Sequence, residues 1–285
     1  MHRLPSLFVA LLLAFSAGIF IAASRSKTEA ARATSFLGFD ANDYPGDEAL
    51  PVLRKTFSFA SFWLGPPPGE KRNTWLGKRP VLESRGFGFL VLYNGRDSRR
   101  LKSVVDGHQK GILDAQSAAK VARQEGFPFG TVIFLDIEEG GRLPESYHEY
   151  VRTWLDELAR AQFLGGAYCS AITVDEGHGN SITTVKDLQD HLNGRKLVFW
   201  VFNDACPPSP GCAFSPAPPV VQGGVSSAAV WQYAQSPRRK DRTKECAASY
   251  AADGNCYAPG DSAHKWFVDV NAATTANPSA ASPRQ

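Results

Sequence analysis

The sequence predicts an α/β protein whose simplest architecture is a TIM-type (β/α)8 barrel. Three observations lead to this prediction. Eight short apolar runs have the composition of buried strands, helical stretches separate several of them, and 285 residues suffice for one such barrel. Because a helix between two apolar strands crosses one face of a sheet, this alternation favours parallel pairing.

The predicted strands are rich in β-branched and aromatic residues. They span residues 35–41, 57–64, 87–94, 131–138, 164–170, 196–204, 228–234 and 266–271. The clearest helical stretches, with apolar residues three or four apart, span residues 112–126, 145–161 and 183–194.

The connections after the sixth and seventh predicted strands are rich in Pro, Cys and Gly and lack a helical pattern. We therefore expect the barrel to be irregular in its last crossovers. A doubly wound open sheet is the alternative fold. No Gly-rich phosphate loop follows the first strand, which argues against a nucleotide-binding version of that sheet.

Residues 1–33 have the pattern of a secretory signal peptide followed by a linker. Arg3 supplies the positive charge, residues 7–23 are apolar, and small residues suited to cleavage follow at 22–24. The apolar run approaches the length of a spanning helix, so an uncleaved N-terminal membrane anchor is the alternative. Either interpretation places the folded region, residues 34–274, outside the cytoplasm: secreted, periplasmic or in the cell envelope.

Residues 275–285 are rich in Ala, Pro and Ser and offer little apolar surface to bury. We predict a disordered tail that begins at Thr275.

The cysteines agree with an oxidising compartment. Cys206 and Cys212 bracket one short loop, and Cys246 and Cys256 bracket another. Four cysteines allow three connectivities, of which 206–212 with 246–256 is the simplest. No Cys-x-x-Cys motif or suitably spaced His accompanies them, so we expect neither zinc nor another cofactor there. Cys169, in an apolar strand, is predicted to be a buried free thiol.

The charge balance argues against nucleic acid as a partner. The formal net charge is only +3, and no basic stripe interleaved with aromatic residues is present. We expect a monomeric protein.

Acidic residues stand where several predicted strands end. Asp40 ends the first strand, Asp136 and Glu138 end the fourth, and Asp269 lies near the end of the last. The carboxyl ends of the strands form the mouth of a barrel and carry its active site. We therefore predict that these four acids meet at the mouth and are catalytic.

Asp136 and Glu138 form the central pair of this prediction. Residues two apart share a face of a strand, about 6.6 Å apart at roughly 3.3 Å per residue. Mutual repulsion in a partly desolvated mouth raises the pKa of one carboxyl. An acid that holds a proton beside an ionised partner is what glycosidic bond cleavage needs. Glu139 points the other way, and helix capping does not explain the pair because Glu is a poor cap.

Four further side chains at comparable strand positions suit a sugar ligand, since aromatic rings stack on the apolar faces of sugars and an amide bonds to hydroxyls. These predicted substrate-binding residues are Tyr93, Tyr168, Trp231 and Gln232.

Other interpretations remain for single acids. For Asp40, a helix cap or Asx turn is an equal alternative. A calcium loop that begins with Asp40 and Asn42 is disfavoured, because Tyr44 and Pro45 occupy positions where the pattern requires a ligand and Gly. Asp204 precedes a Pro-rich segment and is interpreted as a loop residue.

Four motifs resemble those of a known group of proteins. "GFDANDYPG" (38–46), "FLDIEE" (134–139), "AVWQYA" (229–234) and "FVDVN" (267–271) follow the order seen in glycoside hydrolase family 25 lysozymes. They resemble more closely the related secreted bacterial proteins with a glycoside-hydrolase-like domain, the DUF1906 or Rv2525c-like type. The resemblance covers roughly residues 36–271. It implies a TIM-type barrel that acts on cell-wall glycan.

The resemblance also implies roles for the four acids. The proton donor of the lysozymes falls on Glu138, and their other motif acids fall on Asp136, Asp40 and Asp269. Those lysozymes retain configuration, with assistance argued for the acetamido group of the substrate. Asp136 would then orient and stabilise that group.

The leading hypothesis is thus a secreted glycosidase-like protein that binds and hydrolyses a β-linked amino-sugar polymer such as peptidoglycan. A catalytically inactive barrel that binds envelope glycan is one alternative. A metal-dependent deacetylase or phosphodiesterase is another, for which only His108 and His178 lie in plausible loops.

Overall fold

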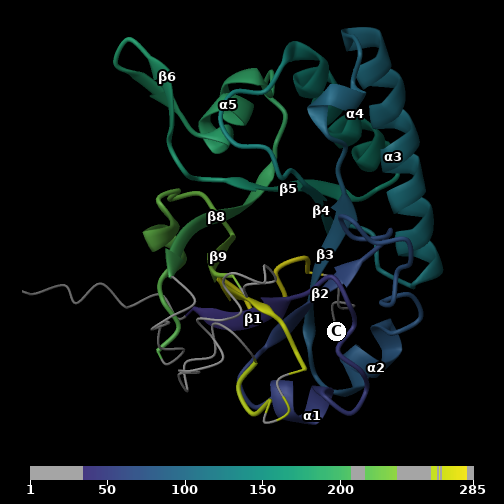
Figure 1. Cartoon of the computed structure of the whole chain (residues 1–285). Helices are drawn as coiled ribbons and strands as arrows, with labels where there is room; N and C mark the ends of the chain where they lie inside the picture. The colour runs from purple at the N-terminus through teal and green to yellow at the C-terminus, as the bar shows by residue number, and fades with distance from the viewer. Residues whose placement is uncertain (1–34, 207–215, 236–257, 262, 264, 281–285) are drawn as a thin grey trace, which may run out of the picture. The chain divides into compact units, whose positions relative to one another are not determined.

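A closed barrel of eight strands forms the body of the protein (Figure 1). The computed structural model describes residues 35–206, 216–235, 258–261, 263 and 265–280, except the side chains of Asp204 and Cys206. The barrel strands are β1 (Phe36–Asp40), β2 (Phe59–Trp63), β3 (Gly88–Asn94), β4 (Val132–Asp136), β5 (Leu164–Ser170), β8 (Val198–Cys206), β9 (Val230–Ala234) and β10 (Asp269–Ala273). The predicted eight-stranded barrel is confirmed, and the open sheet is excluded.

Some predictions concern residues outside the described ranges. They are the N-terminal signal or anchor and the two disulfides that involve Cys206, Cys212, Cys246 and Cys256. Cys169 is buried and free, as predicted. Among the described residues, no helix has the length and apolar character needed to cross a membrane.

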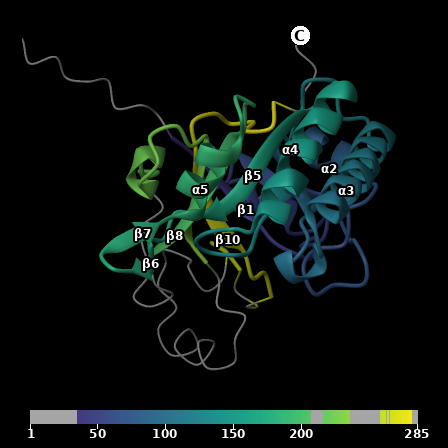
Figure 2. The ribbon, with the colours of Figure 1, turned by 90° about the horizontal axis from the view of Figure 1, so that it is seen from above.

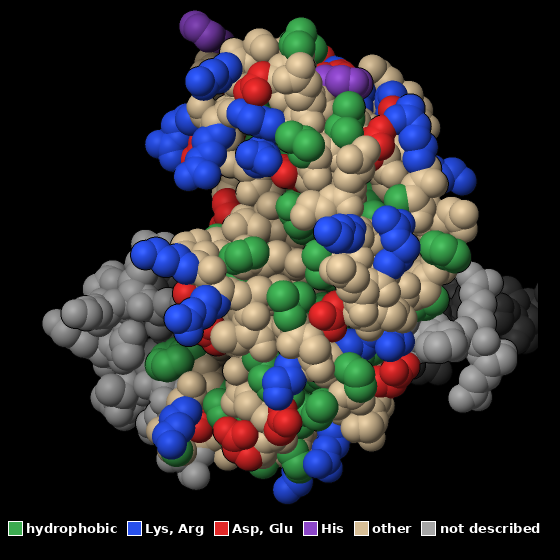
Figure 3. All heavy atoms as spheres, turned by 90° about the vertical axis from the view of Figure 1, so that its right-hand side faces the viewer, with side chains coloured by type: hydrophobic (Ala, Val, Ile, Leu, Met, Phe, Trp, Pro, Cys, Tyr) green, Lys and Arg blue, Asp and Glu red, His purple; other side chains and the backbone are tan. Residues whose placement is uncertain are grey.

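The described α-helices are α1 (Leu50–Leu53), α2 (Arg79–Ser84), α3 (Val104–Gln124), α4 (Glu145–Arg160) and α5 (Thr184–His191). Three of them, α3, α4 and α5, lie where the apolar periodicity predicts them, although α3 begins earlier, and the short α1 and α2 were not predicted. Helices α2, α3 and α4 lie on one side of the barrel, and a hairpin of β6 (Val174–Gly177) and β7 (Asn180–Ile182) projects on another (Figure 2). Figure 3 shows the helical side, where Lys and Arg side chains are interspersed with Asp and Glu, as on a solvated face.

Polar caps and small residues shape these helices. The Ser103 hydroxyl accepts a hydrogen bond from the Asp106 amide at the start of α3. Gly107 and Gly111 of α3 face α4 so closely that an added Cβ at Gly107 would lie 2.1 Å from the Ser146 carbonyl oxygen. The two helices therefore pack against each other with little space between their backbones.

The last strand runs opposite to the prediction. Strands β1, β2, β3, β4, β5, β8 and β9 pair in parallel, but β10 is antiparallel to both β1 and β9. The described part of the connections after β8 and β9 contains only one short 3-10 turn, η2 (Val220–Gly223). Parallel neighbours are usually joined by a crossover helix. Since no such helix is described between β9 and β10, an antiparallel β10 is compatible with this connection.

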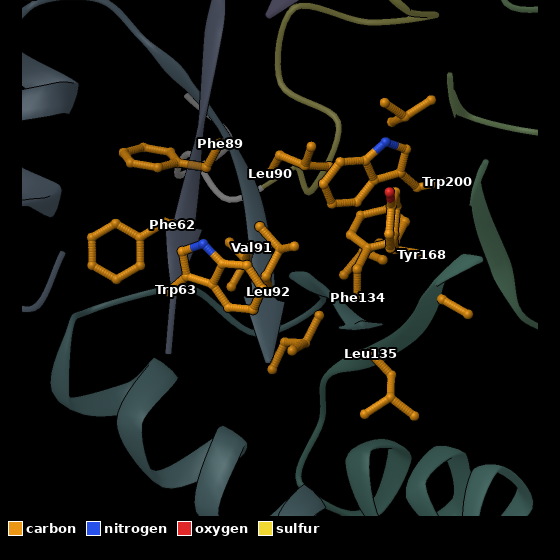
Figure 4. Packing of buried hydrophobic residues seen from close by; sticks show 14 of the residues in the cluster. Phe62, Trp63, Phe89, Leu90, Val91, Leu92, Phe134, Leu135, Tyr168 and Trp200 are labelled. Atoms are coloured by element: carbon orange, nitrogen blue, oxygen red, sulfur yellow. The ribbon is translucent and has the colours of Figure 1, made fainter. Parts of the chain in front are cut away.

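Aromatic side chains fill the barrel interior. The Tyr168 and Trp200 ring centroids lie 4.5 Å apart, and Phe134 meets Trp200 edge to face at 6.0 Å (Figure 4). Gly166, between them on β5, has no room for a side chain, because an added Cβ would lie 2.5 Å from the Phe134 ring. The interior of the barrel is therefore a packed core, and a ligand would bind at the mouth, where the carboxyl ends of the parallel strands lie.

The predicted tail boundary at Thr275 is wrong for residues 275–280. The Asn277 side chain accepts a hydrogen bond from the Phe89 amide at 2.8 Å, and the Ser279 hydroxyl accepts one from the Val91 amide at 2.9 Å. The Ser279 carbonyl accepts a third bond from the Val132 amide. This segment therefore links β3 and β4, and its polar side chains replace strand partners that a composition argument does not anticipate.

Replacing Ser279 by Ala tests this link. Ser279 is fully buried, so the variant leaves the Val91 amide without its acceptor. We expect a loss of about 1–3 kcal/mol in the free energy of unfolding, measured by urea denaturation. Ser227→Ala, at an exposed serine, is the matched control. Equal stabilities of the two variants would contradict the role of the segment.

Candidate active site

The barrel mouth gathers the predicted acids from opposite ends of the chain. Strand register places Asp40 beside Asp269 across β1 and β10, and Asp136 beside Tyr168 across β4 and β5. Asp269 reaches the mouth because it begins an antiparallel strand, whereas the prediction had it near the end of a parallel one.

A hydrogen-bond network fixes Asp40 in the mouth. Its Oδ1 accepts bonds from Gln232 Nε2 at 2.9 Å and from Asn271 Nδ2 at 2.6 Å. The Gln232 amide oxygen accepts a bond from the Tyr168 hydroxyl at 2.8 Å, and Trp200 Nε1 donates to Asn271 Oδ1 at 2.8 Å. Both amides are thereby oriented with their NH2 groups toward Asp40. The alternative of Asp40 as a helix cap does not hold for α1, whose N-cap residue is Ala49.

Asp136 is the least solvated acid of the mouth. Its side chain is 4% exposed, and its Oδ2 atom has no hydrogen bond. Burial raises the pKa of Asp136 well above its ordinary value, and the negative charges of Glu138 and Asp40 raise it further. This carboxyl therefore holds its proton more strongly than a solvated aspartate does.

Glu138 lies two residues further along, beyond the end of β4. Its side chain is exposed, yet partial desolvation by the surrounding protein raises its pKa above the ordinary value. Ile137, between the two acids, is fully buried. Glu139 instead accepts a hydrogen bond from the Ser98 amide, so its carboxylate holds a neighbouring loop.

Tyr168 stands among all four predicted acids. Burial raises the pKa of its hydroxyl well above the ordinary value, and the charges of the four acids raise it further. The Tyr168 hydroxyl therefore keeps its proton and donates a hydrogen bond to the Gln232 amide oxygen.

A pocket of about 730 Å³ opens beside Asp136 and Glu138, and Asp40 and Asp269 are not among its lining residues. Asp136 and Glu138 form one wall, and the loops that follow β2 and β3 form the other, including Pro66–Pro68 and Arg96. The Arg96 guanidinium is held by Asp114 through two bonds of 2.6 Å. The size and polarity of the pocket suit a carbohydrate more than a flat apolar ligand.

One predicted sugar-binding aromatic, Trp231, lies away from the pocket, and another, Tyr93, borders it with its ring packed against a helix. Trp231 precedes the inward-facing Gln232, so its ring points out of the barrel, donates to Asn203 and packs against Gly223 of η2. This placement contradicts a role in stacking on a sugar. Tyr93 also points toward the helices, with its ring 5.4 Å from Trp154 of α4, although it borders the pocket.

Two members of the network, Asn271 and Trp200, were not among the predicted site residues. Asn271 lies two residues after Asp269 and so shares its face, a signal that was available in the "FVDVN" motif. Trp200 lay inside a continuous apolar run, where no alternation shows which side chains point inward.

Part of the barrel matches a glycoside-hydrolase-like family. Residues 80–207 match the family described as the Rv2525c-like, glycoside hydrolase-like domain, and this segment contains Asp136 and Glu138. The resemblance drawn from the sequence motifs is therefore confirmed. A comparison with the curated proteins gave no match.

Solved structures have a similar fold at low sequence identity. An uncharacterized B. stearothermophilus protein is 17% identical with a TM-score of 0.53, over 84% of this chain and 95% of that one. The Tat-secreted protein Rv2525c of Mycobacterium tuberculosis is 17% identical, with a TM-score of 0.49 over 84% and 94%. A family GH25 lysozyme from Aspergillus fumigatus is 12% identical, with a TM-score of 0.43 over 84% and 94%.

The raised pKa of Asp136 predicts a stability that depends on pH. A carboxyl with a higher pKa in the folded chain binds more protons when folded, so its contribution to stability falls as the pH rises through the ordinary carboxyl range. We expect Asp136→Asn to melt above the wild type at pH 7, by about 2–4 °C for each kcal/mol gained. The difference should shrink toward pH 4.

Thermal unfolding followed by circular dichroism at several pH values measures this difference. Asp43→Asn, at an exposed aspartate outside the pocket beside the acids, is the control. A wild type more stable than Asp136→Asn at pH 7 would show that the carboxylate is stabilised in the folded chain.

Proposed function

We propose that the protein is a secreted glycoside hydrolase that binds and cleaves a β-linked amino-sugar polymer such as peptidoglycan. The observation that carries this proposal is the pairing of a buried, incompletely hydrogen-bonded Asp136 with an exposed Glu138 of raised pKa at one barrel mouth. The family description, glycoside hydrolase-like, supports the same class of reaction.

Asp136 favours an amino sugar over a plain hexose. Its Oδ2 is a buried acceptor without a donor, which is costly unless a ligand supplies one. The N–H of a substrate acetamido group is such a donor. Once bonded to Asp136, this N–H makes the acetamido oxygen a better nucleophile toward the anomeric carbon.

Glu138 is the proposed general acid. Its proton passes to the glycosidic oxygen as the bond from that oxygen to the anomeric carbon breaks. The acetamido oxygen bonds to the anomeric carbon and forms a cyclic intermediate, whose positive charge the Asp136 carboxylate stabilises. Water then attacks this carbon and gives a proton to Glu138, which restores the acid with retention of configuration.

Burial favours a protonated Asp136 in the free chain, whereas the N–H of a bound acetamido group favours its ionised form and leaves the proton of the pair on Glu138. Other mouth residues surround this pair. Asp40 accepts hydrogen bonds from two amide donors, and its negative charge helps raise the pKa of Asp136. Tyr168 and Gln232 fix the amide orientation and border the same mouth. We assign Asp269, paired with Asp40, a supporting electrostatic role.

We further propose that the N-terminal segment directs the chain out of the cytoplasm, where envelope glycan is accessible. Its charged, apolar and small-residue regions support this.

Replacing Glu138 by Gln removes the proposed proton and keeps the size of the side chain. We expect loss of hydrolysis by at least about 100-fold with an unchanged melting temperature, since general acid catalysis contributes about 10²–10⁴-fold. Incubation with purified peptidoglycan and mass analysis of the products measures this and identifies the bond cut. Glu48→Gln, at an exposed glutamate outside this pocket, is the matched control.

The alternative function is a glycan-binding barrel without catalysis. Retention of the wild-type chain on insoluble peptidoglycan with no release of reducing ends would establish it. Full activity of Glu138→Gln would exclude Glu138 as the acid.

The raised pKa values also predict the pH profile of hydrolysis. Because the acid must carry its proton, activity falls as the pH rises through the pKa of the coupled pair, which lies above the ordinary carboxyl value of about 4.3. We expect kcat/KM to be retained at pH values where a solvated Glu has already lost its proton. A profile that declines near pH 4.3 would contradict the desolvated pair.

A further inference from the structure

A second cluster of titratable side chains lies between α4 and α5. His148 in α4 faces Asp187 and His191 in α5, and one nitrogen or oxygen from each lies within 4.8 Å of the other two. Asp187 and His191 are one helical turn apart, so they share a face of α5. His108 and His178, the histidines considered in the sequence analysis, are not part of this cluster.

Asp187 is buried with one oxygen unsatisfied. Its side chain is 0% exposed, and its Oδ2 accepts the Leu143 amide at 2.9 Å and lies 2.8 Å from His148 Nε2. Its Oδ1 has no hydrogen bond and only 3.5 Å contacts with Arg142 and His191. A buried carboxylate oxygen in this state is costly unless a cation completes its surroundings.

His148 has at Nδ1 the kind of partner that metal-bound histidines use, whereas His191 Nδ1 faces the cluster, 3.5 Å from Asp187 Oδ1. His148 Nδ1 lies 3.2 Å from the Glu145 carboxylate, and His191 Nδ1 lies 2.7 Å from the Asp187 carbonyl oxygen. An N–H at His148 Nδ1 toward the carboxylate leaves the lone pair at Nε2 for a metal ion. In that tautomer, His148 Nε2 and Asp187 Oδ2 are two acceptors in contact, an arrangement that a shared cation stabilises.

We propose that His148, Asp187 and His191 bind a divalent transition-metal ion, with Zn²⁺ as the best match. Two imidazoles and one carboxylate form a common zinc ligand set, with water in the fourth position. Arg142 does not block the ion, because its guanidinium is held by Glu176 at 2.7 and 2.8 Å.

Binding requires one local movement. The two imidazole rings are stacked, with centroids 3.8 Å apart and planes 7° from parallel, and parallel rings cannot both direct in-plane lone pairs at one ion. The His191 side chain is 33% exposed, so it has room to turn out of the stack, which releases its Nδ1 from the Asp187 carbonyl oxygen and gives the ion a path from solvent.

The site would stabilise the segment that follows β4. Asp187 holds the Leu143 amide, and the Thr184 hydroxyl donates to the Glu139 carbonyl oxygen at 3.2 Å. Both contacts anchor the residues directly after Glu138. The ion would thus act on the fold of this segment and take no part in bond cleavage.

The competing arrangement needs no metal. A doubly protonated His148 between Glu145 and Asp187 forms an ion-pair network that satisfies both ring nitrogens. Metal uptake separates the two arrangements.

The test uses the full chain, treated with a chelator, dialysed and titrated with ZnCl2 by isothermal calorimetry. We expect one equivalent of tightly bound Zn²⁺ and a rise in melting temperature on loading. His191→Ala, at a partly exposed ligand, should lose this uptake, and Glu145→Gln should weaken it by about 10–100-fold. His178→Ala, in the exposed β6–β7 turn, should bind as the wild type does.

Co²⁺ loading gives a second readout, since ion binding at this site should produce visible absorption bands that His191→Ala lacks. The circular dichroism spectrum of each variant checks that it is folded. No stoichiometric uptake by the wild type, or equal uptake by His191→Ala, would overturn the proposal. Neither result depends on whether the barrel hydrolyses glycan.

Discussion

The mouth of this barrel is organised around a carboxylate that the fold does not fully satisfy. Asp136 ends a buried strand, and its Oδ2 lacks a hydrogen bond. The nearby Asp40 is held by two amide donors and keeps a negative charge beside it. Asp40 thus has hydrogen-bond donors, whereas Asp136 Oδ2, in the same mouth, has none. Such a difference between neighbouring carboxyls allows one site to hold both a proton and a charge near neutral pH.

Closure of the barrel determines which residues can reach this mouth. The antiparallel β10 brings Asp269 and Asn271 beside Asp40 from the opposite strand direction. The chain then continues to residues 277–279, which bond to β3 and β4 on the other side of the barrel. The C-terminal part therefore completes both the site and the wall that carries Asp136.

Support for the site extends to the helical layer. Asp187 and Thr184 of α5 anchor the segment after β4, so the position of Glu138 depends on contacts well outside the mouth. The charged cluster of α4 and α5 and the acids of the mouth are joined through this short segment. Stability of the cluster and the geometry of the site are consequently linked.

The sequence by itself determined the eight barrel strands, the three longer helices and the spacing of the central acid pair, but not α1, α2 or the β6–β7 hairpin. Strand and helix periodicities are local, so residues 132–136 and 145–160 are recognisable without knowledge of their neighbours. The spacing of Asp136 and Glu138 is likewise local.

Only the tertiary structure decided the direction of β10 and the outward position of Trp231. It also decided that residues 275–280 bond to the barrel and that His148 contacts Asp187. Each of these depends on which distant segments pair or face one another. Pairing free energy comes from contacts between residues far apart in the chain, and no local pattern records them.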